Sequence, residues 1–326
     1  MIEKLAKLNG ICGFEDEVRD CISNELKEYP QKIDSIGNLH VYNKKANDIL
    51  IAAHMDEVGF IINDITDDGY LKFSTIGKVD AAAVLSKRVK IGRVYGVISF
   101  KAIHLTGKEE REKPIDISKL FIDIGAGTKS EAEKYVTIGD LCTFDINFGR
   151  LGADYIFGKA LNGRIGCAIL ADVLKDKTIS SADVYGLFTV QREILSRGMK
   201  VAAQNIDLPE LGVIIDYIDV SIFKEIALGS GAVLGIPDNA SITERTIYNR
   251  ILKAAERLDL KVQVTACSDS REIDALKSVY ADLSAIQILV PCRNANTDVC
   301  ILNENDIKSV RRVIEILLSG SKGEGK

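Results

Sequence analysis

The sequence predicts an α/β fold in which a mixed sheet, covered by helices on both faces, is interrupted by a β-rich insert. Strand-like and helix-like segments alternate near the N-terminus and again after about residue 159, which is typical of a doubly covered sheet. Between these regions, short strand-like segments and turns follow one another with little helical periodicity. We therefore expect residues 1–62 and 159–326 to form one α/β domain, and residues 63–158 to form an inserted β-rich domain.

The first α/β segment contains one expected helix and one expected strand. Residues 14–29 place Val18, Ile22 and Leu26 on one helical face. Residues 48–53 contain a short apolar run of the kind that forms a strand buried on both faces.

The insert begins with a hairpin pattern. Residues 60–65 and 70–73 are strand-like and flank Asp67-Asp68-Gly69, which suits a tight turn. Residues 88–98 continue the strand pattern, and only residues 130–135 have a helical pattern.

The second α/β segment supplies the remaining strands and helices. Ser241 to Glu244 form a capping box that opens a helix. Strands are expected at 184–190, 211–215, 261–265 and 285–290, and helices at 164–174 and from 241 and 306 onward. In such a sheet, ligands bind at the carboxyl ends of the strands.

Composition excludes several classes of protein. The net charge of -5 and the lack of a basic stripe argue against a nucleic-acid partner. No apolar run approaches the roughly 20 residues of a membrane span, and the N-terminus does not resemble a signal peptide. The seven cysteines are scattered without a Cys-x-x-Cys pair, which fits reduced thiols and predicts a cytoplasmic protein.

Polar residues follow several predicted strands. His54 and Asp56 follow the first, residues 191–193 and Asp216 with Asp219 follow two more, and residues 294–298 follow the last. Each set alone is typical of solvated loops, but together they can converge at one edge of a sheet. A His-x-Asp pair suits a zinc site, since the imidazole binds metal and the carboxylate orients it.

Six longer stretches share the order and spacing of one known family. They are residues 53–60, 103–105, 109–111, 121–126, 159–164 and 188–193. Through them the chain resembles, along nearly its full length, the tetrahedral (glutamyl) aminopeptidases, some of which carry the label cellulase or endoglucanase. The resemblance implies metal-dependent removal of N-terminal residues from peptides, an α/β metallopeptidase domain interrupted by a β-rich dimerisation domain, and a homo-oligomer, either a dimer or a tetrahedral dodecamer assembled from dimers.

The resemblance also implies a two-metal site with a shared carboxylate and a glutamate as general base. His54 matches a metal-binding histidine, and Asp56 matches the carboxylate that orients it. Glu193 and Asp216 match two carboxylate ligands.

Three positions depart from the family pattern. Asn162 replaces the bridging aspartate, Arg192 replaces the general-base glutamate, and Asn296 replaces the last metal-binding histidine. A neutral amide does not offset the repulsion between two dications, and an arginine cannot accept a proton. We therefore expect at most one zinc or cobalt ion per chain, or none, and lost or strongly reduced catalysis.

Two readings of the site remain open beside loss of catalysis. The first is a single-metal hydrolase on His54, Asp216 and Glu193, with Glu57 or Asp219 as the base. The second is a non-catalytic subunit or peptide-binding partner of an active relative. A glycosidase follows only from the family label. Arg192 itself either neutralises the carboxylates or points to solvent.

Overall fold

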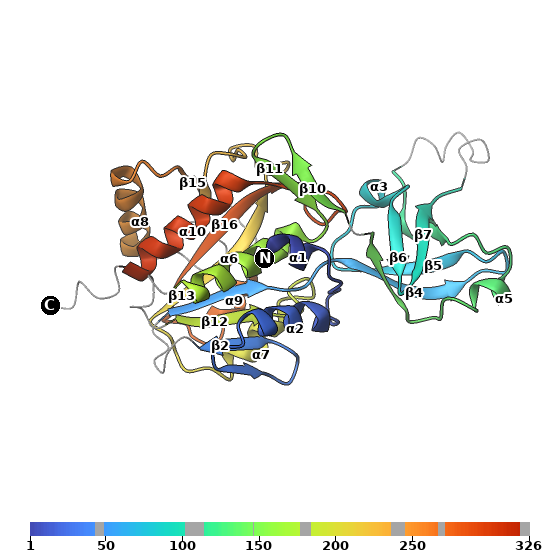
Figure 1. Cartoon of the computed structure of the whole chain (residues 1–326), viewed down its shortest axis with the longest axis horizontal. Coiled ribbons are helices and arrows are strands. Elements are labelled where there is room, and N and C mark those ends of the chain that lie inside the picture. Colours follow the sequence, from blue (N-terminus) through green and yellow to red (C-terminus); the bar gives the residue numbers. More distant parts are fainter. Residues whose placement is uncertain are drawn as a thin grey trace.

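The computed structural model describes residues 1–42, 49–101, 114–145, 147–176, 184–235, 245–266 and 271–319. In these residues it contains a large mixed sheet and a six-stranded closed barrel. Figure 1 shows the barrel projecting from one end of the α/β part. The predicted α/β architecture and its β-rich interruption are confirmed.

The large sheet has the strand order β1-β2-β12-β3-β13-β16-β17-β11-β10, and off this path β14 pairs with β16 and β15 pairs with β14. Its strands are β1 (Gln31–Ile33), β2 (Leu39–Tyr42), β3 (Ile49–His54), β10 (Phe148–Leu151), β11 (Tyr155–Gly158), β12 (Val184–Thr189), β13 (Leu211–Asp219), β14 (Ala232–Gly235), β15 (Val262–Thr265), β16 (Ser284–Arg293) and β17 (Cys300–Asn303). The central strands β12, β3, β13 and β16 are parallel, whereas β2 and β17 pair antiparallel with their neighbours.

Helices cover both faces of this sheet. They are α1 (Ile2–Ala6), α2 (Asp16–Glu25), α6 (Leu161–Lys175), α7 (Arg197–Ala203), α8 (Arg245–Arg257), α9 (Arg271–Lys277) and α10 (Glu304–Ser319). Alternate residues of β3 separate the two faces: Ile51 and Ala53 belong to the core with α6 and α10, and Leu50 and Ala52 to the core with α7 and α9. This alternation explains why the strand is apolar throughout.

The barrel is formed by β4 (Gly59–Ile65), β5 (Leu71–Ile76), β6 (Arg88–Ile91), β7 (Val94–Ser99), β8 (Phe121–Asp123) and β9 (Leu141–Phe144), joined by short helices α3 (Ala81–Val84), η2 (Ile117–Lys119) and α5 (Lys129–Ala132). It has its own apolar core, in which Phe60 contacts Phe73 and Phe144 edge to face. β10 and β11 lie between residue 144 and α6 but pair within the large sheet. The barrel strands therefore begin at residue 59 and end at residue 144, whereas the insert was expected to span residues 63–158. The division into domains stays a prediction.

Two expectations concern single elements, namely the end of one strand and a capping box. β13 was expected to end before Asp216, but it continues to Asp219, so Asp216 lies inside a strand. The capping box at Ser241 to Glu244 lies outside the described residues.

Helix α6 is placed unusually close to β3 by two glycines. A Cβ on Gly166 would lie 3.1 Å from the Ala53 Cβ and 3.1 Å from the Ile215 oxygen. A Cβ on Gly163 would lie 2.4 Å from Cε1 of His54. The close approach brings the first turn of α6 against the end of β3, where the predicted site lies.

A buried ion network also holds the N-terminal segment near the end of β3. The Glu57 carboxylate accepts from Lys159 Nζ at 2.8 Å, Arg164 Nη2 at 3.2 Å and the Gly10 amide at 3.0 Å. Arg164 also donates from Nε to the Met55 oxygen at 2.6 Å. This network joins α6, the N-terminal segment and the turn after β3 into one support behind the site.

Candidate functional site

The predicted site residues gather where three neighbouring parallel strands end. β3 lies between β12 and β13 in the sheet. The residues are His54 at the end of β3, Asp56 just after it, Arg192 and Glu193 after β12, Asp216 within β13, Asn162 in the first turn of α6, and Asn296 between β16 and β17. The predicted convergence at one edge of the sheet is therefore seen.

His54 is fully buried between two carboxylates. Its Nδ1 lies 3.3 Å from Oδ1 of Asp56, and its Nε2 lies 3.6 Å from Oδ1 of Asp216. Burial opposes protonation of the ring, but the adjacent carboxylates of Asp216 and Asp56 outweigh it and raise the pKa of His54 to about 10. The ring is therefore an imidazolium at neutral pH.

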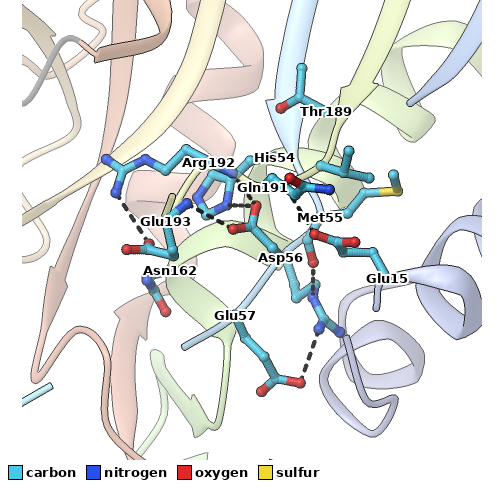
Figure 2. A network of polar contacts seen from close by, with 12 residues as sticks. Glu15, His54, Met55, Asp56, Glu57, Asn162, Thr189, Gln191, Arg192 and Glu193 are labelled. Atoms are coloured by element: carbon cyan, nitrogen blue, oxygen red, sulfur yellow. Dashed lines mark hydrogen bonds and ion pairs between the residues drawn. The ribbon is translucent and has the colours of Figure 1, made fainter. Parts of the chain in front are cut away.

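Asp56 orients the main chain as well as the histidine. Its two carboxylate oxygens accept from the amide of Arg192 at 3.0 Å and the amide of Glu193 at 2.8 Å. Figure 2 shows Asp56 between His54 and this turn. One carboxylate thus fixes the imidazole and the turn that carries Arg192.

Arg192 lies inside the site. Its side chain is 1% exposed, so of the two alternatives left open for Arg192, the one in which it points to solvent is wrong. Nη2 donates to Oδ2 of Asp216 at 2.9 Å, and Nη1 donates to Oε1 of Glu193 at 3.2 Å. The guanidinium also lies over the ring of Tyr217, 5.2 Å from its centroid. The contact with Glu193 is drawn in Figure 2.

These contacts bring the buried charges close to balance. Burial acts to raise the pKa of Asp216, but Arg192 and His54 hold it at about 2. Burial also acts against ionisation of Asp56, yet His54 and the two amides lower its pKa. For Glu193 the burial dominates, and its pKa is raised. Two buried cations therefore face two firmly ionised carboxylates and a third that ionises less readily.

The two substituted amides contact each other. Asn162 Nδ2 donates to Oδ1 of Asn296 at 2.9 Å. Asn296 Nδ2 points the other way and donates to the Lys78 oxygen at 3.4 Å. Asn296 has a φ of +59°, which asparagine tolerates better than most residues. The pair forms a neutral hydrogen-bonded link.

Neither carboxylate named as a substitute base is available. Glu57 is held by Lys159 and Arg164 in the support behind the site. Asp219 accepts from the amides of Ser221 and Ala295, both at 2.8 Å. Both groups have structural partners that hold them in place.

A cleft of about 800 Å³ opens in front of Arg192. One wall comes from the barrel side, and the other comes from the turns after β13 and β16. The barrel wall consists of Lys78, Val79, Asp80, Ala82 and Ala83, and the opposite wall includes Tyr217, Ile218, Asp219, Ile222, Phe223, Asn294 and Asn296. The volume suits a short peptide.

Two buried acids at the site were not predicted from the sequence. Glu15 accepts from the Gln191 amide at 2.9 Å, and its carboxylate lies close to Cys12 and Asp56, a grouping that could hold a metal ion. Glu272 accepts from the Thr189 hydroxyl at 2.6 Å, and its other oxygen has no hydrogen-bond partner among the described residues. Neither acid follows a strand, so strand ends gave no signal for them.

Two stretches that carried the resemblance, residues 103–105 with His104 and residues 109–111, lie outside the described residues. Of the three histidines in the sequence, His40 lies in β2, where it contacts Tyr185 and Asp34. His54 is therefore the histidine that the structure places at the site.

Known proteins resemble this chain along its full length. Residues 37–313 match the family described as M42 glutamyl aminopeptidase. The chain belongs to this family. It is 30% identical over 323 residues to a putative aminopeptidase of Acetivibrio thermocellus, with 96% of each protein covered. The lysyl aminopeptidase of Pyrococcus furiosus is 26% identical, with 99% of this chain and 97% of that protein covered.

The fold also matches that of a solved M42 protein. The TET1 peptidase of Pyrococcus horikoshii, which can assemble into a tetrahedron or a large octahedral shell, superposes with a TM-score of 0.84 at 29% identity. The match covers 97% of each chain. Homologues of this chain are thus metal-dependent aminopeptidases. In the part of this chain that the structure describes, no helix is long and apolar enough to cross a membrane.

The side chains present do not fit a pair of metal ions. The guanidinium of Arg192 contacts both Asp216 and Glu193, where ions would need these oxygens. Asn162 and Asn296 bond each other and carry no charge. A single ion has a better set of donors, because Nε2 of His54 has no hydrogen-bond partner in the part of the chain that the structure describes and lies 3.6 Å from Asp216 Oδ1. His54, Asp216 and Glu193 would hold it.

The first prediction concerns the buried arginine. In chelator, Arg192→Gln should reduce the free energy of unfolding by about 3–5 kcal/mol, because it leaves buried carboxylates without their cation. Arg192→Glu should cost more, since it adds a further negative charge. Urea unfolding at neutral pH measures both. Arg150→Gln, which breaks the exposed pair with Glu304, should cost about 0–1 kcal/mol; an equal loss for Arg192→Gln would contradict the neutralising role.

The second prediction concerns Glu272. Burial raises its pKa to about 7, so the folded protein holds this proton more tightly than the unfolded chain does. Its contribution to stability is present below about pH 4.5 and is lost as pH rises through about 7. Glu272→Gln should remove roughly 3 kcal/mol of this pH-dependent loss, measured by urea unfolding from pH 4.5 to 8. The exposed Asp172→Asn serves as control, and identical profiles for both variants would reject the prediction.

Proposed function

We propose that this chain is an M42 homologue that has lost, or strongly reduced, peptide hydrolysis, and that Arg192 stabilises its site in place of a metal pair. The observation that carries the proposal is the buried guanidinium between Asp216 and Glu193. It takes up the oxygens that two ions would need and supplies positive charge without metal.

The contacts of the carboxylates predicted for the site support the same conclusion. Arginine cannot accept a proton at physiological pH. Glu57 and Asp219 are held by structural contacts, and Asp216 and Glu193 bind Arg192. Each carboxylate at the predicted site is therefore engaged by a cation or an amide, which leaves none poised to activate water.

The rest of the family properties fit a binding or assembly role. The cleft of about 800 Å³ beside Arg192 is large enough for a short peptide. Similar solved proteins assemble into tetrahedral and octahedral shells. We propose a cytoplasmic homo-oligomer with residues 63–158, which include most of the barrel, as the dimerisation domain, acting as a peptide-binding protein or as the partner of an active relative.

A single-metal hydrolase is the second candidate. It is favoured by Nε2 of His54, which has no hydrogen-bond partner within the described ranges, and by the adjacent Asp216 oxygen. Binding would require the imidazolium to lose its proton and Arg192 to give up at least one carboxylate, because a dication and a guanidinium repel each other. Zinc or cobalt suits such a mixed nitrogen and oxygen site.

The third prediction separates these two candidates. After dialysis against zinc or cobalt, elemental analysis should find at most one ion per chain, and N-terminal residues should not be released from short peptides at a measurable rate. Loss of a positioned base alone removes about 10²–10⁴-fold in rate. Two tightly held ions would refute the proposal. Robust turnover that Asp216→Ala abolishes would establish the single-metal hydrolase.

The fourth prediction concerns the three substitutions together. Asn162→Asp alone adds a carboxylate without a cation and should destabilise the protein in chelator. The triple variant Asn162→Asp, Arg192→Glu, Asn296→His restores the family set around His54, Glu193 and Asp216. Its melting temperature should rise on addition of zinc or cobalt, because ions that bind only the folded state stabilise it. An equal response in the unaltered protein, or none in the triple variant, would show that these positions do not form a two-metal site.

A further inference from the structure

The cleft lies between the two parts of the molecule, and one short segment forms its barrel wall. Residues 77–84 connect β5 to the end of α3. They supply Lys78, Val79, Asp80, Ala82 and Ala83 to the cleft, opposite the turns after β13 and β16. In Figure 1, α3 lies on the side of the barrel that faces the large sheet. Movement of this segment would therefore open or close the cleft.

The segment is seated directly on the site. Gly77 has a φ of +83°, and a Cβ there would lie 2.7 Å from Cγ1 of Val58 and 3.2 Å from the Cβ of Glu193. A side chain at position 77 would therefore push the segment away from Glu193. The next residue, Lys78, accepts through its main-chain oxygen the hydrogen bond from Asn296.

Asn162 and Asn296 connect this segment to the α/β core. Asn162 in α6 donates to Asn296 at 2.9 Å, and Asn296 donates onward to Lys78 at 3.4 Å. One amide oxygen and two amide nitrogens thus form a continuous chain from α6 to the barrel. A second contact lies beside it, where Lys87 Nζ is 3.0 Å from Oδ1 of Asp298.

We propose that residues 77–84 are a lid over the cleft, and that the two asparagines at the substituted positions form the latch that holds it closed. The metal-ligand positions 162 and 296 would then have acquired a mechanical role. The chemistry favours this role, since an amide both donates and accepts and can relay a hydrogen bond between two elements. The proposal does not depend on whether the chain hydrolyses peptides.

The lid can be followed with a single fluorophore. The chain contains no tryptophan, so Phe223→Trp places a unique reporter on the wall opposite the lid. Quenching by acrylamide reports the open population. Loss of one hydrogen bond shifts such an equilibrium by about fivefold. In the Phe223→Trp background, Asn296→Gly should therefore raise the ratio of open to closed lid, obtained from the quenching, by about fivefold.

The loop supplies its own matched control. Asn294 also has a φ of +59° and also lines the cleft, but its amide donates toward Val299 within the same loop. Glycine relieves the backbone at both positions, so Asn294→Gly tests the loss of an asparagine outside the latch. It should leave quenching unchanged. Equal quenching in the two glycine variants would overturn the latch.

Variants on the barrel side of the contact test whether increased quenching comes from opening of the lid and not from local unfolding of the loop. Gly77→Ala and Lys87→Met act from the barrel and should also raise quenching, with far-UV circular dichroism unchanged. Asn162→Ala combined with Asn296→Gly should open the lid no further than Asn296→Gly alone, because both remove the same chain of bonds. Additive opening, or no opening by the barrel variants, would reject the lid and its latch.

Discussion

The arrangement of the site depends on one ionic contact, the Arg192 guanidinium between Asp216 and Glu193. All three side chains are buried, and an isolated buried charge costs several kcal/mol. Arg192 and the imidazolium of His54 together offset Asp56 and Asp216 without any ion. The main chain follows from the same contacts, because Asp56 holds the amides of Arg192 and Glu193.

Arg192, Asn162 and Asn296 complement one another in the structure. Arg192 supplies the charge, and Asn162 with Asn296 supplies a neutral hydrogen-bonded link where charged ligands would repel each other without metal. In this arrangement an aspartate at 162 would lack a cation, and a glutamate at 192 would add repulsion. The family fold is kept because its core and its buried Glu57 network do not involve these positions.

Local sequence patterns predict much of the fold but only part of the site. The fully apolar run in β3 predicts a strand buried on both faces, and the polar residues at the ends of parallel strands predict where they meet. The pairing of β10 and β11 into the large sheet could not be predicted, because their short strands resemble those of the barrel. The direction of Arg192 was also open, because it depends on the left-handed turn at Gln191 and on the carboxylates it reaches. Glu15 and Glu272 become visible only through tertiary contacts.

The most direct test of the central claim is anomalous diffraction from crystals grown with zinc. We predict electron density for the Arg192 guanidinium between Asp216 and Glu193, and no pair of zinc peaks at the site. Two peaks about 3.5–4 Å apart, flanked by Glu193 and Asp216 with Arg192 turned away, would contradict the claim.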